Sequence, residues 1–155
     1  MTQTALQPRA EPTLDLDEYV PYLVNRVGAR IATAFSRELA PHGISLAMWR
    51  VLAVLAQSGA QRQIDLAELT SIDASTLSRL VNSVQRLGLV VRARSTASLR
   101  EVTITLTPRG RAIVRELTPH ALEYEAVAVQ GLSPHELDTL KALLRRIHAN
   151  MSAAD

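Results

Sequence analysis

The stretch "QIDLAELTSIDASTLSRLVNSVQRLG", Gln63 to Gly88, holds two helix-like segments separated by the short break "TSI". Asp73 is a predicted N-cap for the second segment, and Gly88 is its predicted end. Apolar residues of that segment recur at i, i+3, i+4, i+7 and i+10, which places them on one helix face: Leu77, Leu80, Val81, Val84 and Leu87. Two short helices joined by a tight break predict a helix–turn–helix unit.

Two further helices are predicted before this unit. Apolar residues at helical spacing indicate a helix from near Val20 to Leu39, ended by Pro41 and Gly43. A second helix is expected between Ser45, its predicted N-cap, and Gly59.

After Gly88 the apolar spacing changes from helical to alternating, with Val102, Ile104 and Leu106 at every second position. The polar run "STAS" separates two strand-like arms, so we predict a β-hairpin. Thr107 and Pro108 then begin a long helix that is expected to kink at Pro119 and end at Gly131. Ser133 and Glu136 form a predicted capping box that begins a last helix, which ends near Met151.

Composition agrees with a mainly α-helical fold that carries a small β-hairpin wing. The chain has 155 residues, of which 47% are hydrophobic and 3% aromatic. The absence of cysteine excludes a disulfide framework, a thiolate zinc site and a thiol redox sensor. The first 15 residues resemble a flexible tail and not a signal peptide, and no apolar run reaches the roughly 18 residues of a membrane span. We therefore expect a cytoplasmic protein without a membrane partner.

Charge is unevenly distributed along the chain, although the formal net charge is only +2. No carboxylate lies between Asp73 and Glu101, whereas five arginines do. Acidic residues would be repelled by phosphate, and short hydroxyls let a nucleic-acid backbone approach closely. We predict that double-stranded DNA is contacted by Ser75, Thr76, Ser78, Arg79 and Asn82 of the second helix and by Arg94 and Arg100 of the wing.

Other interpretations of this stretch stay open. The face is also compatible with simple solvation, and Arg86 and Arg92 could equally pair within the fold. A winged-helix module that binds protein instead of DNA is the alternative function, but it predicts an exposed apolar patch where Ser and Arg stand. No catalytic constellation, cofactor motif or metal-ligand spacing is evident, which argues against an enzyme.

The residues "LAELTSIDASTLSRLVNSVQRLGLVVR", Leu66 to Arg92, and "LREVTITLTPRGRAIV", Leu99 to Val114, resemble the MarR family of winged-helix transcriptional regulators. The resemblance implies a homodimer whose terminal helices, residues 16–42 and 108–151, form a helical dimerisation region. It assigns residues 45–107 to the winged helix–turn–helix and residues 1–15 to the tail. Such a dimer is expected to bind a pseudo-palindromic operator.

One position departs from the family pattern. In the wing, the family usually has an Asp two residues before the arginine that enters the minor groove, and here Ser98 stands two residues before Arg100. A serine offers one hydrogen bond but no charge, so the orientation of Arg100 is in question and Arg94 is expected to share its role.

The stretches "YLVNRVGARI" and "GISLAMWRVL" are similar to regulators of aromatic-acid breakdown. The resemblance implies a repressor that an aromatic carboxylate, or its CoA thioester, releases from DNA, in a pocket among the first, second and fifth helices. Arg26 and Arg30, on one helix face, are suited to an anion, whereas Trp49 is compatible with either ring stacking or the core. The candidate residues are Tyr19, Tyr22, Asn25, Arg26, Arg30, His42, Met48, Trp49 and Arg50.

Overall fold

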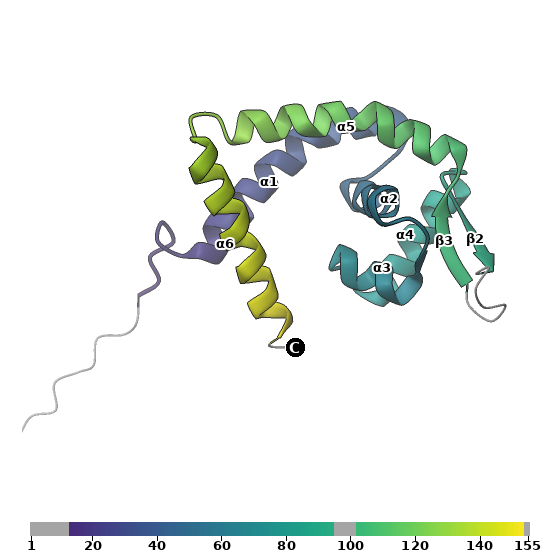
Figure 1. Cartoon of the computed structure of the whole chain (residues 1–155), viewed down its shortest axis with the longest axis horizontal. Coiled ribbons are helices and arrows are strands. Elements are labelled where there is room, and N and C mark those ends of the chain that lie inside the picture. Colours follow the sequence, from purple (N-terminus) through teal and green to yellow (C-terminus); the bar gives the residue numbers. More distant parts are fainter. Residues whose placement is uncertain (1–12, 95–101, 154–155) are drawn as a thin grey trace, which may run out of the picture.

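The computed structural model describes residues 13–94 and 102–153 of a mainly α-helical chain with a small antiparallel sheet. The elements in order are α1 (Val20–Leu39), the 3₁₀ turn η1 (Ala40–His42), α2 (Leu46–Ser58), β1 (Gln61–Arg62), α3 (Gln63–Thr70), α4 (Ala74–Arg86), β2 (Val90–Arg94), β3 (Val102–Leu106), α5 (Pro108–Ala128) and α6 (Pro134–Ser152). Helices α2 to α4 and the sheet, here called the winged unit, gather at the N-terminal end of α5 (Figure 1). Helix α1 packs along α5, and α6 leaves the far end of α5.

The predicted helix starts are confirmed at the level of single hydrogen bonds. The Met48 amide donates to Ser45 Oγ at 3.2 Å, and the Gly110 amide donates to Thr107 Oγ1 at 3.0 Å. At the start of α6 the capping box is complete, since Ser133 and Glu136 satisfy each other's backbone amides. These caps satisfy amide donors that the helix itself leaves unpaired.

The C-terminal end of the long helix α5 differs from its prediction. The helix continues through Pro119 but ends at Ala128, three residues before the predicted stop at Gly131. The Val129 amide still bonds to the Glu125 carbonyl, and the chain then makes successive turns in which Gly131 takes a φ of +90°. The glycine therefore belongs to the turn that redirects the chain into α6.

The sheet has the order β1–β3–β2 and includes a strand that the sequence pattern does not reveal. The predicted hairpin arms are present, with Val90 opposite Leu106 and Arg94 opposite Val102. The extra strand, β1, pairs antiparallel to β3 and places Gln61 opposite Ile104.

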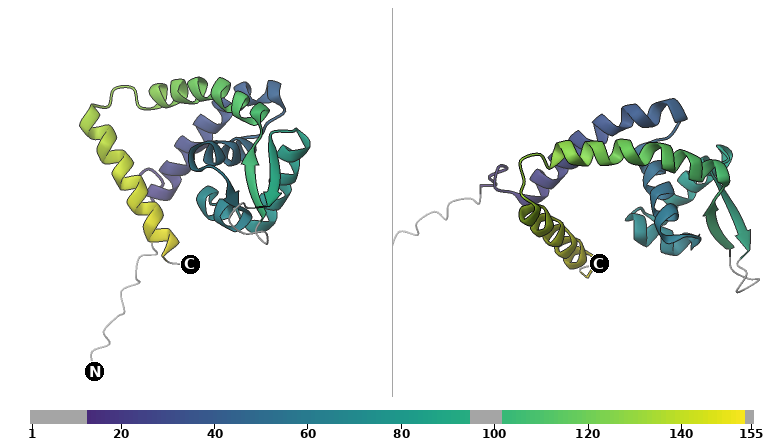
Figure 2. Two further views of the ribbon diagram at one scale, coloured as in Figure 1. Left: turned by 45° about the vertical axis from the view of Figure 1, so that its right-hand side comes forward. Right: turned by 45° about the horizontal axis from the view of Figure 1, so that its top comes forward.

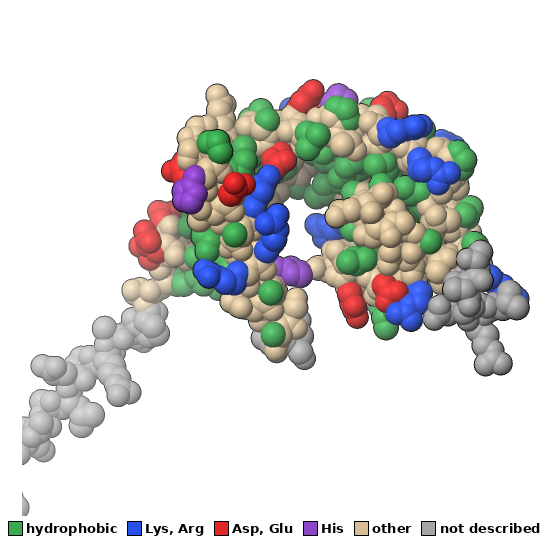
Figure 3. Space-filling view, viewed as in Figure 1, with side chains coloured by type: hydrophobic (Ala, Val, Ile, Leu, Met, Phe, Trp, Pro, Cys, Tyr) green, Lys and Arg blue, Asp and Glu red, His purple; other side chains and the backbone are tan. Residues whose placement is uncertain are grey.

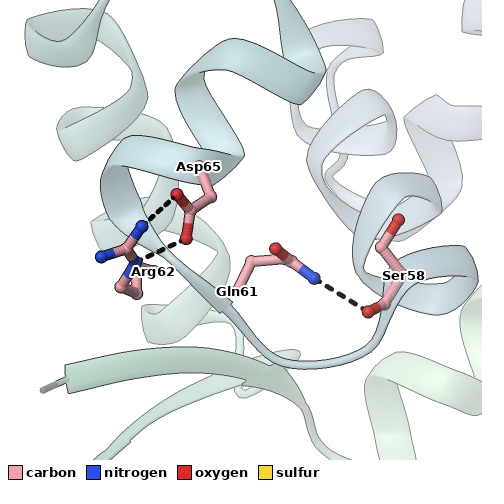
Figure 4. Close-up of polar contacts among 4 residues, drawn as sticks. All are labelled: Ser58, Gln61, Arg62 and Asp65. Atoms are coloured by element: carbon pink, nitrogen blue, oxygen red, sulfur yellow. Dashed lines mark hydrogen bonds and ion pairs between the residues drawn. The ribbon is translucent and has the colours of Figure 1, made fainter.

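Side chains around β1 hold the beginning of α3 against the end of α2 (Figure 4). Gln61 Nε2 donates to the Ser58 carbonyl at 2.8 Å. Arg62 forms a two-point contact with Asp65, at 2.6 and 2.7 Å, and this hydrogen-bonded guanidinium lowers the pKa of the Asp65 carboxyl. The strand thus links two helices of the winged unit at their ends.

The hydrophobic core lies in the winged unit and in the parts of α1 and α5 that cover it. Phe35 and Leu39 of α1 and Val114 and Leu117 of α5 join it, whereas α6 has no buried residue. Helix α6 starts far from the winged unit and approaches α3 only with its C-terminal end (Figures 1 and 2), where His148 Nε2 lies 3.2 Å from Ser71 Oγ. Among the described residues no helix is by itself long and apolar enough to cross a membrane, although α1 with η1 and α2, bent by 82°, meet that criterion as a pair on length and composition alone.

Candidate nucleic-acid interface and effector groove

The turn between α3 and α4 depends on a serine in the left-handed region of backbone space. Ser71 has a φ of +52°, and among the described residues it is the only non-glycine residue with a positive φ. The amides of Ser71 and Ile72 donate back to the carbonyls of Glu68 and Ala67, at 3.1 and 3.2 Å. These bonds close α3 and turn the chain sharply into α4, as a helix–turn–helix requires.

Asp73 is the N-cap of α4, and one oxygen of its carboxylate is engaged in that role. Its Oδ1 accepts from the Ser75 hydroxyl at 2.7 Å and from the Thr76 amide at 2.9 Å. These two bonds, first that from Ser75, hold the pKa of the Asp73 carboxyl far below its usual range. The acidic side chain at the start of α4 therefore satisfies one amide that the helix leaves unpaired, that of Thr76, through Oδ1.

The face of α4 that points away from the core is polar and cationic. Leu77, Val81 and Val84 are buried, which leaves Ser75, Arg79 and Asn82 exposed. An Arg79 Nη2 atom lies 3.5 Å from Ser75 Oγ, a long contact that leaves the guanidinium free to reorient. Two predicted contact residues, Thr76 and Ser78, are only half-exposed, and they lie at the border of this face.

The wing carries one of its two predicted DNA-contacting arginines within the described residues. Arg94 is the last residue of β2 and is exposed. Ser98 and Arg100 lie outside the described residues. Arg92 donates to Gln85 Oε1 of α4, and Arg86 donates to Ser83 Oγ at 3.2 Å, so both have partners within the fold.

At the base of the wing, the backbone of α5 at Gly110 packs directly against the Leu89 carbonyl, a contact that the sequence pattern did not identify. A Cβ on Gly110 would lie 2.1 Å from the Leu89 carbonyl oxygen, well inside contact distance. The amide of Thr107 donates to the same carbonyl at 3.0 Å, and the Thr107 hydroxyl donates to the Gly88 carbonyl at 2.7 Å. The motif "LTPRG" thus has a physical reason: its threonine caps α5, and its glycine lets α5 contact the chain between α4 and β2.

A groove of about 460 Å³ runs between α1 and α5. Its walls are mainly apolar, its cationic groups are Arg26 and Arg30, and Tyr124 contributes an aromatic ring from α5. The Tyr124 hydroxyl donates to Glu38 at 3.1 Å, and burial together with this carboxylate raises the pKa of Tyr124. An adjoining hollow on α1 includes Asn25 beside the same two arginines.

The predicted effector residues are only partly brought together. Arg26 stacks over the Tyr22 ring, 5.4 Å from its centroid. His42 lies outside the groove, with Nε2 3.6 Å from Glu116 Oε1, and Trp49 packs edge-on against Phe35 in the core at 5.3 Å. The remaining candidates also lie elsewhere: Tyr19 at the N-cap of α1, Met48 half-buried beside the core, and Arg50 near the Thr70 carbonyl.

Tyr124 is an aromatic groove residue that is not among the predicted effector residues. It lies near the C-terminal end of α5, where no local sequence pattern marks it, and only the packing of α5 on α1 brings it to the groove. Within the described residues no group of three or more His, Cys, Asp or Glu side chains is arranged to hold a metal ion.

This geometry defines the class of winged helix–turn–helix proteins, here with long helices added on both sides of the winged unit. Residues 42–101 match the model of the MarR family. A MarR family transcriptional regulator from Silicibacter pomeroyi, known from its crystal structure, is 33% identical, with 88% of this chain and 92% of that chain covered and a TM-score of 0.78. The chain belongs to the MarR family.

Two further relatives are informative. The HTH-type transcriptional repressor Rv2887 of Mycobacterium tuberculosis is 31% identical over 91 residues, which span 59% of this chain and 66%, just under two thirds, of the repressor. BpsR of Bordetella bronchiseptica, whose DNA binding is regulated by 6-hydroxynicotinic acid, is 28% identical. That comparison covers 88% of this chain and 98% of BpsR, with a TM-score of 0.77.

Proposed function

We propose that this protein is a sequence-specific DNA-binding transcriptional regulator, a repressor that works in the cytoplasm and has no enzymatic activity of its own. The observation that carries the proposal is the exposed face of α4, where Ser75, Arg79 and Asn82 stand and where no Asp or Glu occurs from Ala74 to Arg86. Phosphate repels carboxylates, and the acid that precedes this helix, Asp73, accepts hydrogen bonds from the helix start through Oδ1. The protein-binding alternative requires an apolar patch on this face, but the apolar stripe of α4 is buried.

In the proposed complex the N-terminal half of α4 enters the major groove. Arg79 is long enough to donate to the O6 and N7 edge of a guanine, and Ser75, Thr76, Ser78 and Asn82 contact phosphates or base edges nearby. Arg94, at the end of β2, and Arg100, beyond the described residues, are proposed to follow the adjacent minor groove.

We further propose that two copies form the active species, through residues 16–42 and 108–151, with residues 45–107 reading DNA. The support is an exposed apolar stripe on α1 and another on α6. Val24 and Val27 of α1 are 46% and 57% exposed, and Leu143 and Leu144 of α6 are each 41% exposed. Apolar patches of this extent mark association surfaces. A two-fold dimer would read half-sites about one helical turn, roughly 34–36 Å, apart.

The proposed effector is an anionic aromatic compound, either a free carboxylate or its CoA thioester. The α1–α5 groove supports this class, because its apolar walls accept a ring while Arg26 and Arg30 accept an anion. The regulation of BpsR by 6-hydroxynicotinic acid, an aromatic carboxylic acid, adds support from a relative of similar architecture. Binding in this groove is proposed to release the repressor from its operator.

Selection of genomic fragments by the purified protein tests the central proposal. Bound fragments are sequenced, and a labelled duplex carrying the enriched site is titrated with protein while fluorescence anisotropy is measured. We expect specific binding that is at least about 10³-fold tighter than binding to a scrambled duplex. Equal affinity for both duplexes, or no affinity for duplex DNA in dilute buffer, would contradict the proposal. Aromatic carboxylates added to the complex then test the effector.

A further inference from the structure

A second hollow lies at the base of the wing, on a different part of the molecule from the α1–α5 groove. It has a volume of about 480 Å³ and is formed by the end of α2, the end of β3 and the first turns of α5. This volume falls in the range of roughly 300–1,000 Å³ that small-molecule sites occupy. We call it the wing-base hollow.

The floor of the wing-base hollow is apolar. Leu55, Leu106 and Val114 belong to the core, with exposed fractions of 3%, 5% and 8%, and each also lines the hollow. Ala56 and Gly59 stand at its edge and are small, so that the floor stays accessible. A floor of this kind favours an apolar body over a hydrated ion.

The rim is cationic. Arg111 and Arg115 stand one turn apart on α5, and Figure 3 shows Lys and Arg side chains gathered over the N-terminal end of this helix. Arg111 is held in place because its Nη1 donates to the Leu106 carbonyl at 2.8 Å. Within the described residues neither guanidinium pairs with a carboxylate, and the neighbouring Glu116 faces His42 instead.

This arrangement has an electrostatic cost that an anion would remove. Like charges at i and i+4 on a helix destabilise the helix. The first turn of α5 has no acidic residue, and the positive end of its helix dipole adds to the unfavourable field around Arg111, the fourth residue of the helix. The half-buried Thr105 hydroxyl also lines the hollow and offers one more donor to an anion.

We propose that the wing-base hollow is a second ligand site, which binds a small organic carboxylate with an apolar body. The carboxylate lies between Arg111 and Arg115, and the apolar body covers Leu55, Leu106 and Val114. A bound ligand therefore touches both β3 of the wing and α5. The inference does not depend on DNA binding, since it concerns a surface formed by α2, β3 and α5.

Calorimetric titration of the full chain with 4-phenylbutyrate, in the absence of DNA, tests this site. We expect binding with a Kd of about 1 mM or below, and affinity at least about tenfold lower for the neutral amide of the same acid. Amide signals of Gly59, Thr105 and Arg111 are expected to shift in the spectrum of nitrogen-labelled protein. No binding at about 5 mM, or equal affinity for acid and amide, would overturn the proposal.

Two substitutions locate the ligand. Arg115→Gln removes one cation, and Ala56→Glu places a competing carboxylate at the edge of the hollow; both positions are exposed, so urea unfolding is expected to match the wild type. Each is expected to weaken 4-phenylbutyrate binding about tenfold or more. The control is Arg109→Gln, at an exposed position of α5 that does not line the hollow, which is expected to bind as the wild type does. Loss of binding in the double variant Arg26→Gln and Arg30→Gln, but not in Arg115→Gln or Ala56→Glu, would place the ligand in the α1–α5 groove and refute this inference.

Discussion

Helices α4 and α6 carry the same apolar pattern but have opposite surroundings. Both place apolar residues at i, i+3, i+4 and i+7: Leu77, Leu80, Val81 and Val84 in α4, and Leu140, Leu143, Leu144 and Ile147 in α6. In α4, three of the four are fully buried. In α6, all four are exposed by 39% to 42%. The pattern therefore specifies a helix with one apolar face but does not specify what covers that face.

What differs is the connection that precedes each helix. The tight turn at Ser71 folds α4 back onto α2 and α3, whereas after the turn around Gly131 helix α6 packs closely on no other element among the described residues and only its C-terminal end approaches Ser71. Apolar surface left in water is unfavourable by about 25 cal/mol for each Å². A partner that covers the exposed apolar residues of α6 would therefore gain binding free energy. A second copy of the chain is the cover we propose.

Truncation of one leucine in α4 and one in α6 should give the largest difference in the free energy of unfolding. Leu77→Ala creates a cavity in the core and is expected to lower the free energy of unfolding by about 2–5 kcal/mol at every protein concentration. Leu144→Ala is expected to cost less than about 1 kcal/mol in dilute solution and to raise the Kd of the dimer. Urea unfolding at several concentrations, with sedimentation, measures both. A concentration-independent loss of equal size in Leu144→Ala would show that α6 packs within its own chain.

A glycine pair compares the winged unit with α1. Gly110→Ala forces a methyl group against the Leu89 carbonyl and is expected to lower the free energy of unfolding by about 1–3 kcal/mol or more. In Gly28→Ala the new methyl group meets no atom within 4 Å, and helix propensity predicts a gain of about 0.5–1 kcal/mol. Thermal unfolding of both variants is the measurement, and a stable Gly110→Ala protein would refute the close approach of α5 to the wing.

On the DNA-binding face, Arg79→Ala is expected to weaken operator binding by about 1–3 kcal/mol and to relax base preference at one position. The reason is the loss of a side chain that reaches base edges. Anisotropy titrations with a set of single-base operator variants measure this, and a scrambled duplex is the control.

Arg100→Ala should have a smaller and more uniform effect. We expect lower affinity for all duplexes and a shallower dependence of log K on log salt, because one phosphate-neutralising cation is lost. Arg94→Ala is the matched variant on the described part of the wing. Wild-type affinity and salt dependence in all three variants would remove α4 and the wing from the DNA interface.

The smallest expected effect is the stability lost at low pH when Asp73, the N-cap of α4, is protonated. The Asp73 pKa is lowered in the folded protein, so its contribution to stability is complete above the unfolded pKa of about 3.9 and is lost as the pH falls through the folded pKa. Asp73→Asn keeps a good capping residue that does not titrate. Between pH 5 and about pH 2 the wild type is expected to lose more stability than Asp73→Asn. Parallel urea midpoints across this range would contradict the role of the carboxylate.

Local signals predicted the helix–turn–helix and most helix boundaries from the sequence. Caps such as Ser45 and Asp73 act within three residues of themselves, so the sequence alone reveals them. Strand β1 was missed because two residues carry no periodicity, and it exists only through pairing with β3 some forty residues later. The end of α5 was misplaced because Gly131 serves the following turn.

The candidate sites divide along the same line. The exposed position of Arg79 follows from the buried stripe of its own helix, which the sequence displays. The α1–α5 groove depends on how two distant helices pack, so the sequence of α1 revealed Arg26 and Arg30, whereas nothing in the sequence of α5 marked Tyr124. His42 and Trp49 were grouped with them because the family resemblance implies a pocket among the first, second and fifth helices, yet one faces Glu116 and the other packs on Phe35.

The contact between Gly110 and Leu89 makes α5 a lever with its pivot at the wing. With 21 residues and a rise of about 1.5 Å for each, the helix is about 32 Å long. A tilt of about 5° around this contact would move the far end of α5 by about 3 Å. At Gly110 the helix backbone lies directly against the Leu89 carbonyl, with no side chain between them. Displacement of the α5–α6 turn would therefore be transmitted as rotation directly to the strand that carries Arg94.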